Sequence, residues 1–459
     1  MNGTLPLIAG ADLDAPLAWR DGRPLARRQY LADVRALAAR LPAAGPMLNV
    51  TADRYRFAVG LGAAMLRGQS NLMPPNHTPD TVARLRDLFP GAYGLVDTSE
   101  PGPALPLVRH ADAAERTPDG EGESVPQLPD AMLAAQVLTS GSTGAPVPHA
   151  KHWGPLTRNA CAGAQRLARE MGRPSLVGVT LVATVPPQHM YGFESTVLIA
   201  LLGGAAFDVA RPFYPADIAR ALERAPRPRM LVTTPFHLKM LLDSGLALPA
   251  IDLTLCATAP LSPQLAARAE AALAAPLMEI YGCTEAGQVA SRRPSAGIEW
   301  HTYDGLRLSG DGADTRVQGG HVPQAIRLAD VIEVIDATRF RLLGRSNDLI
   351  NIAGKRSSLA HLNHHLNTIP GVHDGAFWLP PDDAAGGVVR LVAFVVAPGL
   401  TPQALHAQVV KALRERVDAA FLPRRVIAVA ALPREATTGK LPTASFGAWA
   451  ERALATARA

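Results

Sequence analysis

The most informative stretch of this chain is Thr139-Ser140-Gly141-Ser142-Thr143-Gly144-Ala145-Pro146. It follows a short apolar run over residues 133–138, which predicts a buried strand. Glycines and small hydroxyl residues after a strand let the backbone turn tightly, so that successive N–H groups and hydroxyls point into one concavity. Such a concavity binds phosphate oxygens, although an ordinary Ser/Gly turn has the same composition. The other motifs of the chain must decide between these two interpretations.

The bulk composition indicates a folded protein without nucleic-acid or membrane partners. The chain has 459 residues, of which 48% are hydrophobic and 19% charged, so one large domain with a smaller one is expected. The net charge of +5 comes from scattered arginines and not from runs of basic residues. Three widely spaced cysteines give neither a disulfide framework nor a metal-ligand spacing. With no signal pattern and no apolar run that could span a bilayer, we expect a cytoplasmic location.

Helix and strand signals alternate along the first three quarters of the chain. This alternation continues to about residue 343 and predicts layered α/β architecture with mostly parallel strands. After it come strand-like runs over 375–379 and 388–396, a helical apolar pattern over 405–417, and a further strand over 426–432. The C-terminal part is therefore predicted to be a small α+β module.

Two further motifs change the interpretation of the first one. They are Tyr281-Gly282-Cys283-Thr284-Glu285 and Thr437-Thr438-Gly439-Lys440. In this order and at these separations, the three motifs resemble the signature of the adenylate-forming superfamily of acyl-CoA synthetases, aryl-acid ligases and peptide-synthetase adenylation domains. The resemblance covers nearly the whole chain. It implies a large adenylation domain over residues 1–344 and a small mobile domain over 345–459, with a hinge at Asn347.

The resemblance also implies the reaction. A carboxylic acid attacks the α-phosphate of ATP, with Mg²⁺ as the metal, to give acyl-AMP and pyrophosphate, and the acyl group then passes to a thiol. Because both reactants of the first step are anions, the site must neutralise charge and hold the two in line.

Several segments supply the ATP or AMP site that the resemblance implies. Its residues are Thr139, Ser140, Gly141, Ser142, Thr143, Gly144, Thr258, Ala259, Tyr281, Asp330, Arg345 and Arg356. Tyr281 is implied to stack on adenine. Asp330 is implied to accept hydrogen bonds from both ribose hydroxyls, which suits a carboxylate with two acceptor oxygens. Arg345 is implied to contact the ribose as well.

Four residues have catalytic roles by the same resemblance. Thr284 is implied to bond a phosphate oxygen, and Glu285 to help hold Mg²⁺, which prefers oxygen ligands. Lys440 is implied to bring its ammonium between the carboxylate and the α-phosphate, where it stabilises charge in the transition state. His189 is implied to guard the carboxylate end of the acid.

The phosphate loop departs from the family pattern at two positions. Val147 stands where a lysine usually follows the loop proline, and Pro148 replaces a glycine. The departure removes the cationic contact of the loop but not its backbone N–H groups. Lys151 lies four residues further on, and the sequence leaves open whether it takes over that contact.

The acid pocket is implied by two segments. Its residues are His189, Tyr191, Gly192, Phe193 and Ala257. Relatives that activate amino acids usually place an aspartate near Tyr191, so a plain carboxylic acid is expected, whether aryl or fatty. Residues 144–153 loosely resemble small adenylating enzymes of bacterial aryl-polyene and polyketide-type clusters. That likeness implies the phosphopantetheine thiol of an acyl carrier protein as acceptor, with coenzyme A as the alternative.

Two other classes of protein compete with this interpretation. A P-loop nucleoside triphosphatase needs a Gly-x-x-x-x-Gly-Lys-Ser/Thr loop, which residues 140–147 do not provide. An inactive nucleotide-binding homologue stays open, because Val147, Asn347 and the lack of a glutamate after Arg356 depart from the family. His361 and His365 are four apart, but no further ligand pattern accompanies them, so a metal site is not predicted there.

Overall fold

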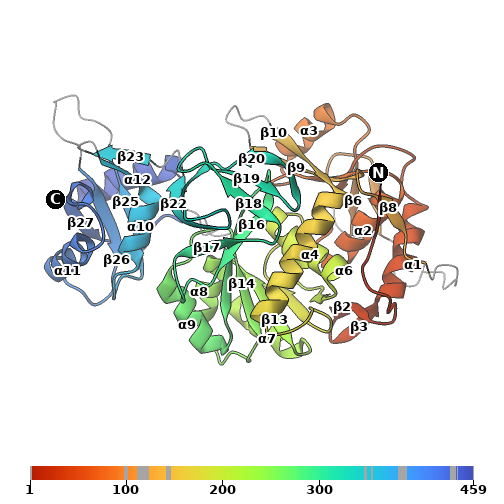
Figure 1. The fold of residues 1–459 in the computed structure, drawn as a ribbon, viewed down its shortest axis with the longest axis horizontal. Coiled ribbons are helices and arrows are strands. Elements are labelled where there is room, and N and C mark those ends of the chain that lie inside the picture. The colour runs from red at the N-terminus through yellow and green to blue at the C-terminus, as the bar shows by residue number, and fades with distance from the viewer. Residues whose placement is uncertain are drawn as a thin grey trace.

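Two large sheets with surrounding helices form most of the molecule, and a smaller group of C-terminal elements lies at one end (Figure 1). The computed structural model describes residues 3–97, 102–110, 124–140, 146–345, 349–352, 355–380, 390–434, 441 and 443–457. The predictions for Gly141 to Gly144, Asn347 and Lys440 lie outside the described residues.

The smaller of the two large sheets has six strands in the described part of the chain. In spatial order they are β10 (Pro146–His152), β9 (Leu133–Ser140), β5 (Asn71–Met73), β4 (Met47–Asn49), β6 (Tyr93–Val96) and β7 (Leu107–Arg109). Neighbours from β9 to β7 are parallel, and β10 returns antiparallel to β9. The hairpin of β9 and β10 therefore flanks the segment predicted to be the phosphate loop.

The larger sheet has eleven strands among the described residues. In spatial order they are β21 (Asp330–Val334), β22 (Arg339–Arg345), β17 (Glu299–Thr302), β16 (Gly287–Arg292), β15 (Leu277–Cys283), β14 (Leu253–Cys256), β13 (Arg229–Thr233), β11 (Thr180–Ala183), β12 (Ala206–Asp208), β2 (Pro16–Arg20) and β3 (Arg23–Ala26). Neighbours from β15 to β2 are parallel. The predicted α/β architecture is confirmed, and antiparallel strands border its parallel centre.

Two smaller antiparallel sheets complete the N-terminal three quarters of the described chain. One pairs β1 (Thr4–Pro6) with β8 (Gln127–Pro129), and the other joins β18 (Leu306–Ser309), β19 (Arg316–Gly319) and β20 (Val322–Arg327).

Most helices connect parallel strands, and several begin at the same local signal. They are α1 (Arg27–Ala38), α2 (Arg54–Leu66), α3 (Pro79–Leu88), α4 (Trp153–Glu170), α5 (Met190–Gly192), a π-helix (Phe193–Leu198), α6 (Ile199–Gly203), α7 (Pro215–Arg224), α8 (Pro235–Asp243) and α9 (Pro263–Leu273). The side chains of Thr78, Thr234 and Ser262 each accept a hydrogen bond from the N–H three residues on. A proline follows each of them at the first helical position, where its missing N–H has no partner to lose. These three helices thus begin at a signal that is local in the sequence.

The C-terminal elements form an α+β group with its own apolar clusters. They are β23 (Leu349–Ile352), β24 (Lys355–Ser358), α10 (Leu359–Asn367), β25 (Asp374–Trp378), β26 (Val392–Val396), α11 (Pro402–Arg414), a 3-10 helix (Ala419–Phe421), β27 (Arg425–Ala428) and α12 (Thr443–Thr456). The predicted order of strand, strand, helix and strand is confirmed. Strand β22 ends at Arg345, and the domain boundary between residues 344 and 345 stays a prediction.

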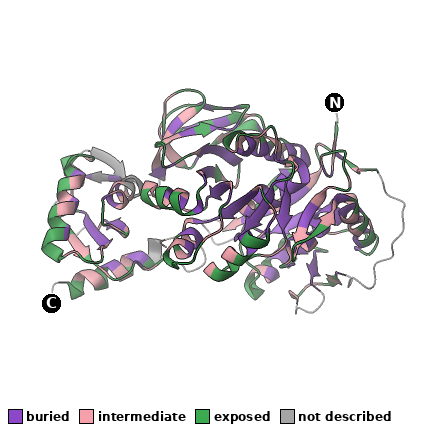
Figure 2. Ribbon diagram, turned by 90° about the horizontal axis from the view of Figure 1, so that it is seen from below, coloured by how far each residue is buried: buried purple, intermediate pink, exposed green. Residues whose placement is uncertain are grey.

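Buried residues gather in the strands and on the inner sides of the helices (Figure 2). Strands β11, β13 and β14 are buried along their whole length, as expected of parallel strands that are covered on both faces. Within the described ranges, every helix is too short or too polar to cross a membrane.

Candidate active site

The candidate site lies beyond the carboxyl ends of the parallel strands in the larger sheet. Strands β11, β14 and β15 lead into the three segments predicted to bind the acid and the nucleotide, which are residues 186–193, 257–261 and 281–285. Parallel strands deliver the loops that follow them to one edge, and this edge is where α/β sheets bind ligands. The fold thus brings together segments that are widely separated in the sequence.

The backbone after β14 is strained at Thr258. Its φ of +83° lies in the left-handed region, which β-branched residues rarely adopt. The Thr258 side chain is exposed, next to half-buried Ala259 and buried Ala257. Strain of this kind persists only where the surrounding structure enforces it, and it gathers at ligand sites. This strain is an independent reason to place a ligand against residues 257–259.

Tyr281 and Asp330 meet although they are far apart in the sequence. The Tyr281 hydroxyl donates a hydrogen bond to Asp330 Oδ2 at 2.7 Å. The Tyr281 ring packs edge-on against Trp300 and Phe340, with centroid distances of 5.8 and 5.6 Å. Arg345 lies opposite Asp330 in the register of β21 and β22. The two residues that are implied to contact the ribose are thus neighbours on adjacent strands.

A tight turn between β15 and β16 carries Thr284 and Glu285. A Cβ on Gly282 would lie 2.4 Å from the carbonyl oxygen of Gly287, so the hairpin has no room for a side chain there. Thr284 is half-buried and Glu285 is exposed. Burial is the main cause that raises the pKa of the Cys283 thiol to about 12, so this cysteine is not a nucleophile at neutral pH.

Glu285 fits a magnesium ion that is shared with phosphates. Its exposed carboxylate offers the oxygen ligands that Mg²⁺ prefers. The described residues contain no group of three or more His, Cys, Asp or Glu side chains that could hold a metal ion by themselves. The remaining ligands would therefore have to come from nucleotide phosphates and water.

Strands β9 and β10 flank the predicted phosphate loop and place Val147 and Lys151. Val147 pairs with Thr139 across the hairpin and is 44% exposed. The Thr139 hydroxyl lies 3.0 Å from His149 Nε2. Lys151 is buried, and its Nζ donates to the carbonyl oxygens of Thr284 and Glu285. Its ammonium is thus bound to the β15–β16 turn.

The segment predicted to line the acid pocket mixes exposed and packed residues. His189 is exposed just before α5. The Tyr191 hydroxyl lies 3.1 Å from the Thr233 carbonyl oxygen and 2.9 Å from that of Leu255, so it ties this segment to the ends of β13 and β14.

Packing explains Gly192 and Phe193, the next two residues of the predicted acid pocket. A Cβ on Gly192 would lie 2.0 Å from the carbonyl oxygen of Pro186. Phe193 is fully buried against Phe57, with a centroid distance of 6.4 Å. Close backbone contact explains the glycine, and core packing explains the phenylalanine.

For three other predicted residues the structure describes only the backbone. Ser140 ends β9, Arg345 ends β22, and Arg356 lies opposite Asn351 in the β23–β24 pair. Their predicted ligand contacts stay predictions.

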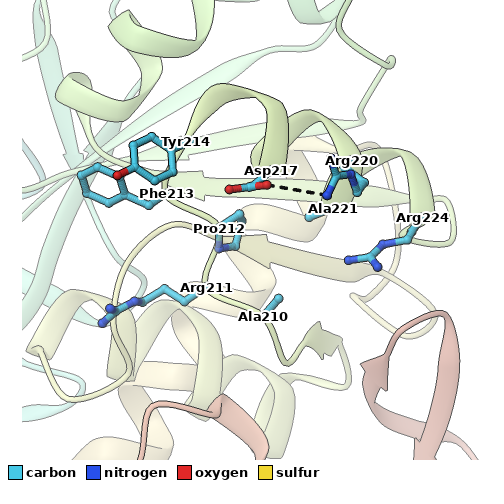
Figure 3. Close-up of a pocket in the computed structure, with 9 residues that line it drawn as sticks. All are labelled: Ala210, Arg211, Pro212, Phe213, Tyr214, Asp217, Arg220, Ala221 and Arg224. Atoms are coloured by element: carbon cyan, nitrogen blue, oxygen red, sulfur yellow. Dashed lines mark ion pairs between the residues drawn. The ribbon is translucent and has the colours of Figure 1, made fainter.

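A basic pocket after β12 was not found from the sequence (Figure 3). It has a volume of about 360 Å³ and is lined in part by Arg211, Phe213, Tyr214, Arg220 and Arg224. Phe213 and Tyr214 are 37% and 67% exposed, which is unusual for large aromatic side chains. The run Arg211-Pro212-Phe213-Tyr214 directly after a strand was the signal that could have indicated this pocket.

The Phe213 ring connects this pocket to the acid segment. It packs edge-on against His237, with a centroid distance of 5.0 Å. His237 lies in α8, just after the Thr233 carbonyl group that Tyr191 contacts.

Comparisons with known proteins identify the family of the chain. The family model for AMP-binding enzymes matches residues 63–319. A 4-coumarate–CoA ligase of Rhodobacter capsulatus is 29% identical over 361 residues, which cover 77% of this chain and 87% of the relative. One of Halorhodospira halophila is 30% identical over 322 residues, covering 66% of this chain and 73% of the relative.

Solved structures share the fold over almost the whole length. ATP-bound MatB from Rhodopseudomonas palustris has a TM-score of 0.75 at 18% identity, covering 96% of this chain and 98% of its own. The anthranilate CoA ligase AuaEII, in complex with anthranoyl-AMP, has a TM-score of 0.75 at 16% identity and covers 99% of each chain. The chain therefore belongs to the AMP-binding enzyme family and is an adenylate-forming acid ligase, as its three motifs predict.

Proposed function

We propose that this enzyme activates an aromatic carboxylic acid as its acyl-AMP and then transfers the acyl group to the thiol of coenzyme A. The observation that carries the adenylation step is the hydrogen bond between Tyr281 and Asp330, beside the strained backbone of Thr258. It supports a site for an adenine ring and a ribose. The names of the relatives, 4-coumarate–CoA ligase, support an aryl acid and coenzyme A.

In this proposal the two ends of ATP bind different segments. Adenine lies against Tyr281, the ribose binds Asp330 and Arg345, and the phosphates bind residues 139–144. Mg²⁺, bound by Glu285 and the phosphates, neutralises part of the phosphate charge. Thr284 donates to a phosphate oxygen.

The acid approaches from the other side of the site. His189 lies at its carboxylate end, and Tyr191 and Ala257 border its ring. Lys440 neutralises charge between the carboxylate and the α-phosphate. Residues 345–459 are proposed to be a mobile domain that turns about Asn347 between the two half-reactions. Since ATP and coenzyme A are available in the cytoplasm, we propose that location.

The choice of acceptor differs from the one that the sequence favoured. The loop continuation indicated an acyl carrier protein, whereas the relatives' names support coenzyme A. The basic pocket adds a physical argument. Arg220 and Arg224 pair with Asp217 and Asp21. Arg211 and the two exposed aromatic rings suit a phosphate and the adenine ring of coenzyme A, because guanidinium groups bind phosphates and aromatic faces stack on bases.

Acid-dependent exchange of labelled pyrophosphate into ATP tests the first half-reaction. With a panel of benzoates, cinnamates and fatty acids, exchange should be fastest with an aryl acid. A hydrolase would release phosphate from ATP without the carboxylic acid. An inactive homologue would show neither phosphate release nor pyrophosphate exchange. Either result would contradict the proposal.

The acceptor is tested with the purified acyl-adenylate and either coenzyme A or a holo acyl carrier protein. Arg211→Ala should raise the KM for coenzyme A roughly tenfold, because a hydrogen bond to a charged group contributes about 1.5 kcal/mol. The KM for ATP should not change, and the exposed control Arg86→Ala should alter neither constant. Transfer to the carrier protein alone would restore the acceptor that the sequence favoured.

A further inference from the structure

Lys151 holds the turn that carries Thr284 and Glu285. It lies on β10, shares a strand face with exposed Val147, and is itself only 8% exposed. Its Nζ donates to the Thr284 carbonyl oxygen and, at 3.1 Å, to that of Glu285. A lysine that binds two consecutive carbonyl groups restrains the backbone between them, and so the direction of the two side chains.

Glu194 is a buried acid whose charge acts on the Lys151 ammonium. Glu194 lies on the π-helix and is 4% exposed. Burial lowers the pKa of Lys151, and Glu194 is the strongest of the charges that oppose this shift. Glu194 Oε1 accepts a hydrogen bond from Asn159 Nδ2 at 2.5 Å. The hydrogen bond from Asn159 on α4 thus fixes the Glu194 carboxyl group in place.

Glu194 and Asn159 also touch the other end of the same turn. A Cβ on Gly287 would lie 2.7 Å from Glu194 Oε1 and 2.8 Å from Asn159 Nδ2. The turn therefore rests on polar side chains at both ends: Lys151 under residues 284 and 285, and the Glu194–Asn159 pair under Gly287.

We propose that Lys151 is a positioning residue for adenylation: by binding the Thr284 and Glu285 carbonyl groups, it aims the side chains of these two residues at the ATP phosphates and Mg²⁺. The proposal rests on the proposed function. It answers the question that Val147 raises, because the lysine acts on the β15–β16 turn and does not replace the missing loop contact.

Three variants separate positioning from stability. Lys151→Met keeps most of the side-chain length but removes the charge, Glu194→Gln removes the anion, and the double variant removes both. The matched control is Lys239→Met, since Lys239 is exposed and pairs with Asp243 on its own helix. All four are compared with the wild-type enzyme in acid-dependent pyrophosphate exchange and in thermal unfolding.

Lys151→Met should lower kcat for exchange about 10- to 100-fold, because small displacements of a positioned group have costs of this size. It should raise the KM for Mg·ATP and leave the KM for the acid nearly unchanged. The double variant should regain Tm relative to Lys151→Met, since glutamine does not carry the cost of burying an ionisable carboxyl group, but it should not regain kcat. Recovery of kcat together with Tm would overturn the proposal, as would wild-type kinetics in Lys151→Met.

A measurement that does not depend on activity tests the role of Lys151 separately from the proposed function of the enzyme. Amide hydrogen exchange of residues 284–287 should be faster in Lys151→Met than in the wild type and in Lys239→Met. Unchanged protection of these amides would overturn the positioning role. Absence of acid-dependent pyrophosphate exchange in the wild-type enzyme would instead overturn the proposed function.

Discussion

Replacing Asp330 by alanine tests the ribose site most directly. In the proposed complex the carboxylate accepts two hydrogen bonds from the ribose. Asp330 is half-exposed, so water replaces part of what is lost, and about 1 kcal/mol for each bond is a suitable magnitude. The sum of about 2 kcal/mol corresponds to a KM for ATP raised roughly 30-fold.

The variant also removes the acceptor of the Tyr281 hydroxyl, so Tyr281→Phe is the matched control. It keeps the ring that packs against Trp300 and Phe340 and removes only the hydroxyl that lies 2.7 Å from Asp330 Oδ2. Because water can reach Asp330, this control should raise the KM for ATP only a few-fold.

Pyrophosphate exchange with ATP and 2′-deoxy-ATP then forms a cycle between the side chain and the hydroxyl group. The wild-type enzyme should discriminate against 2′-deoxy-ATP about fivefold, the equivalent of about 1 kcal/mol. Asp330→Ala should discriminate little, because the partner of the missing hydroxyl is already gone. If Asp330→Ala still discriminates as strongly as the wild type, Asp330 does not bind the ribose and the assigned register is wrong.

Two further predictions concern Lys440 and Glu194. Lys440→Ala should slow acid-dependent pyrophosphate exchange about 10²–10³-fold. It should still transfer the acyl group from synthetic acyl-adenylate at nearly the wild-type rate. Equal loss of both steps in folded protein would contradict the proposal that residues 345–459 turn between the two half-reactions. Burial raises the pKa of Glu194 from 4.5 to about 7, although Lys151 and the hydrogen bond from Asn159 oppose the shift. The folded state therefore binds a proton more tightly than the unfolded chain, and stability is lost as the pH rises from about 4.5 to 7. Relative to Glu194→Gln, the wild-type free energy of unfolding should fall by up to about 3 kcal/mol across this window. Denaturant unfolding at pH 5 and pH 8 measures it, and a difference that does not vary with pH would show that Glu194 does not titrate there.

Local patterns in the sequence were sufficient for much of the fold. The helix starts at Thr78, Thr234 and Ser262 follow from a hydroxyl cap and a proline, which depend only on neighbours in the chain. The alternation of helix and strand signals predicted layered α/β architecture with mostly parallel strands, because parallel neighbours need a crossover between them. The antiparallel strands between residues 287 and 345 were not separately predicted, since short turns leave no such signal.

For the candidate site too, the sequence predicted some features and only the tertiary structure showed others. The order and spacing of three motifs indicated the family and predicted its nucleotide-binding segments, since backbone turns and functional side chains there lie within a few residues of one another. Only the tertiary structure brought Tyr281 to Asp330 and Lys151 to the β15–β16 turn. It also showed that Gly192 has no space for a side chain beside Pro186. Such contacts join residues on different elements, and the packing of those elements, which no local pattern encodes, decides which side chains meet.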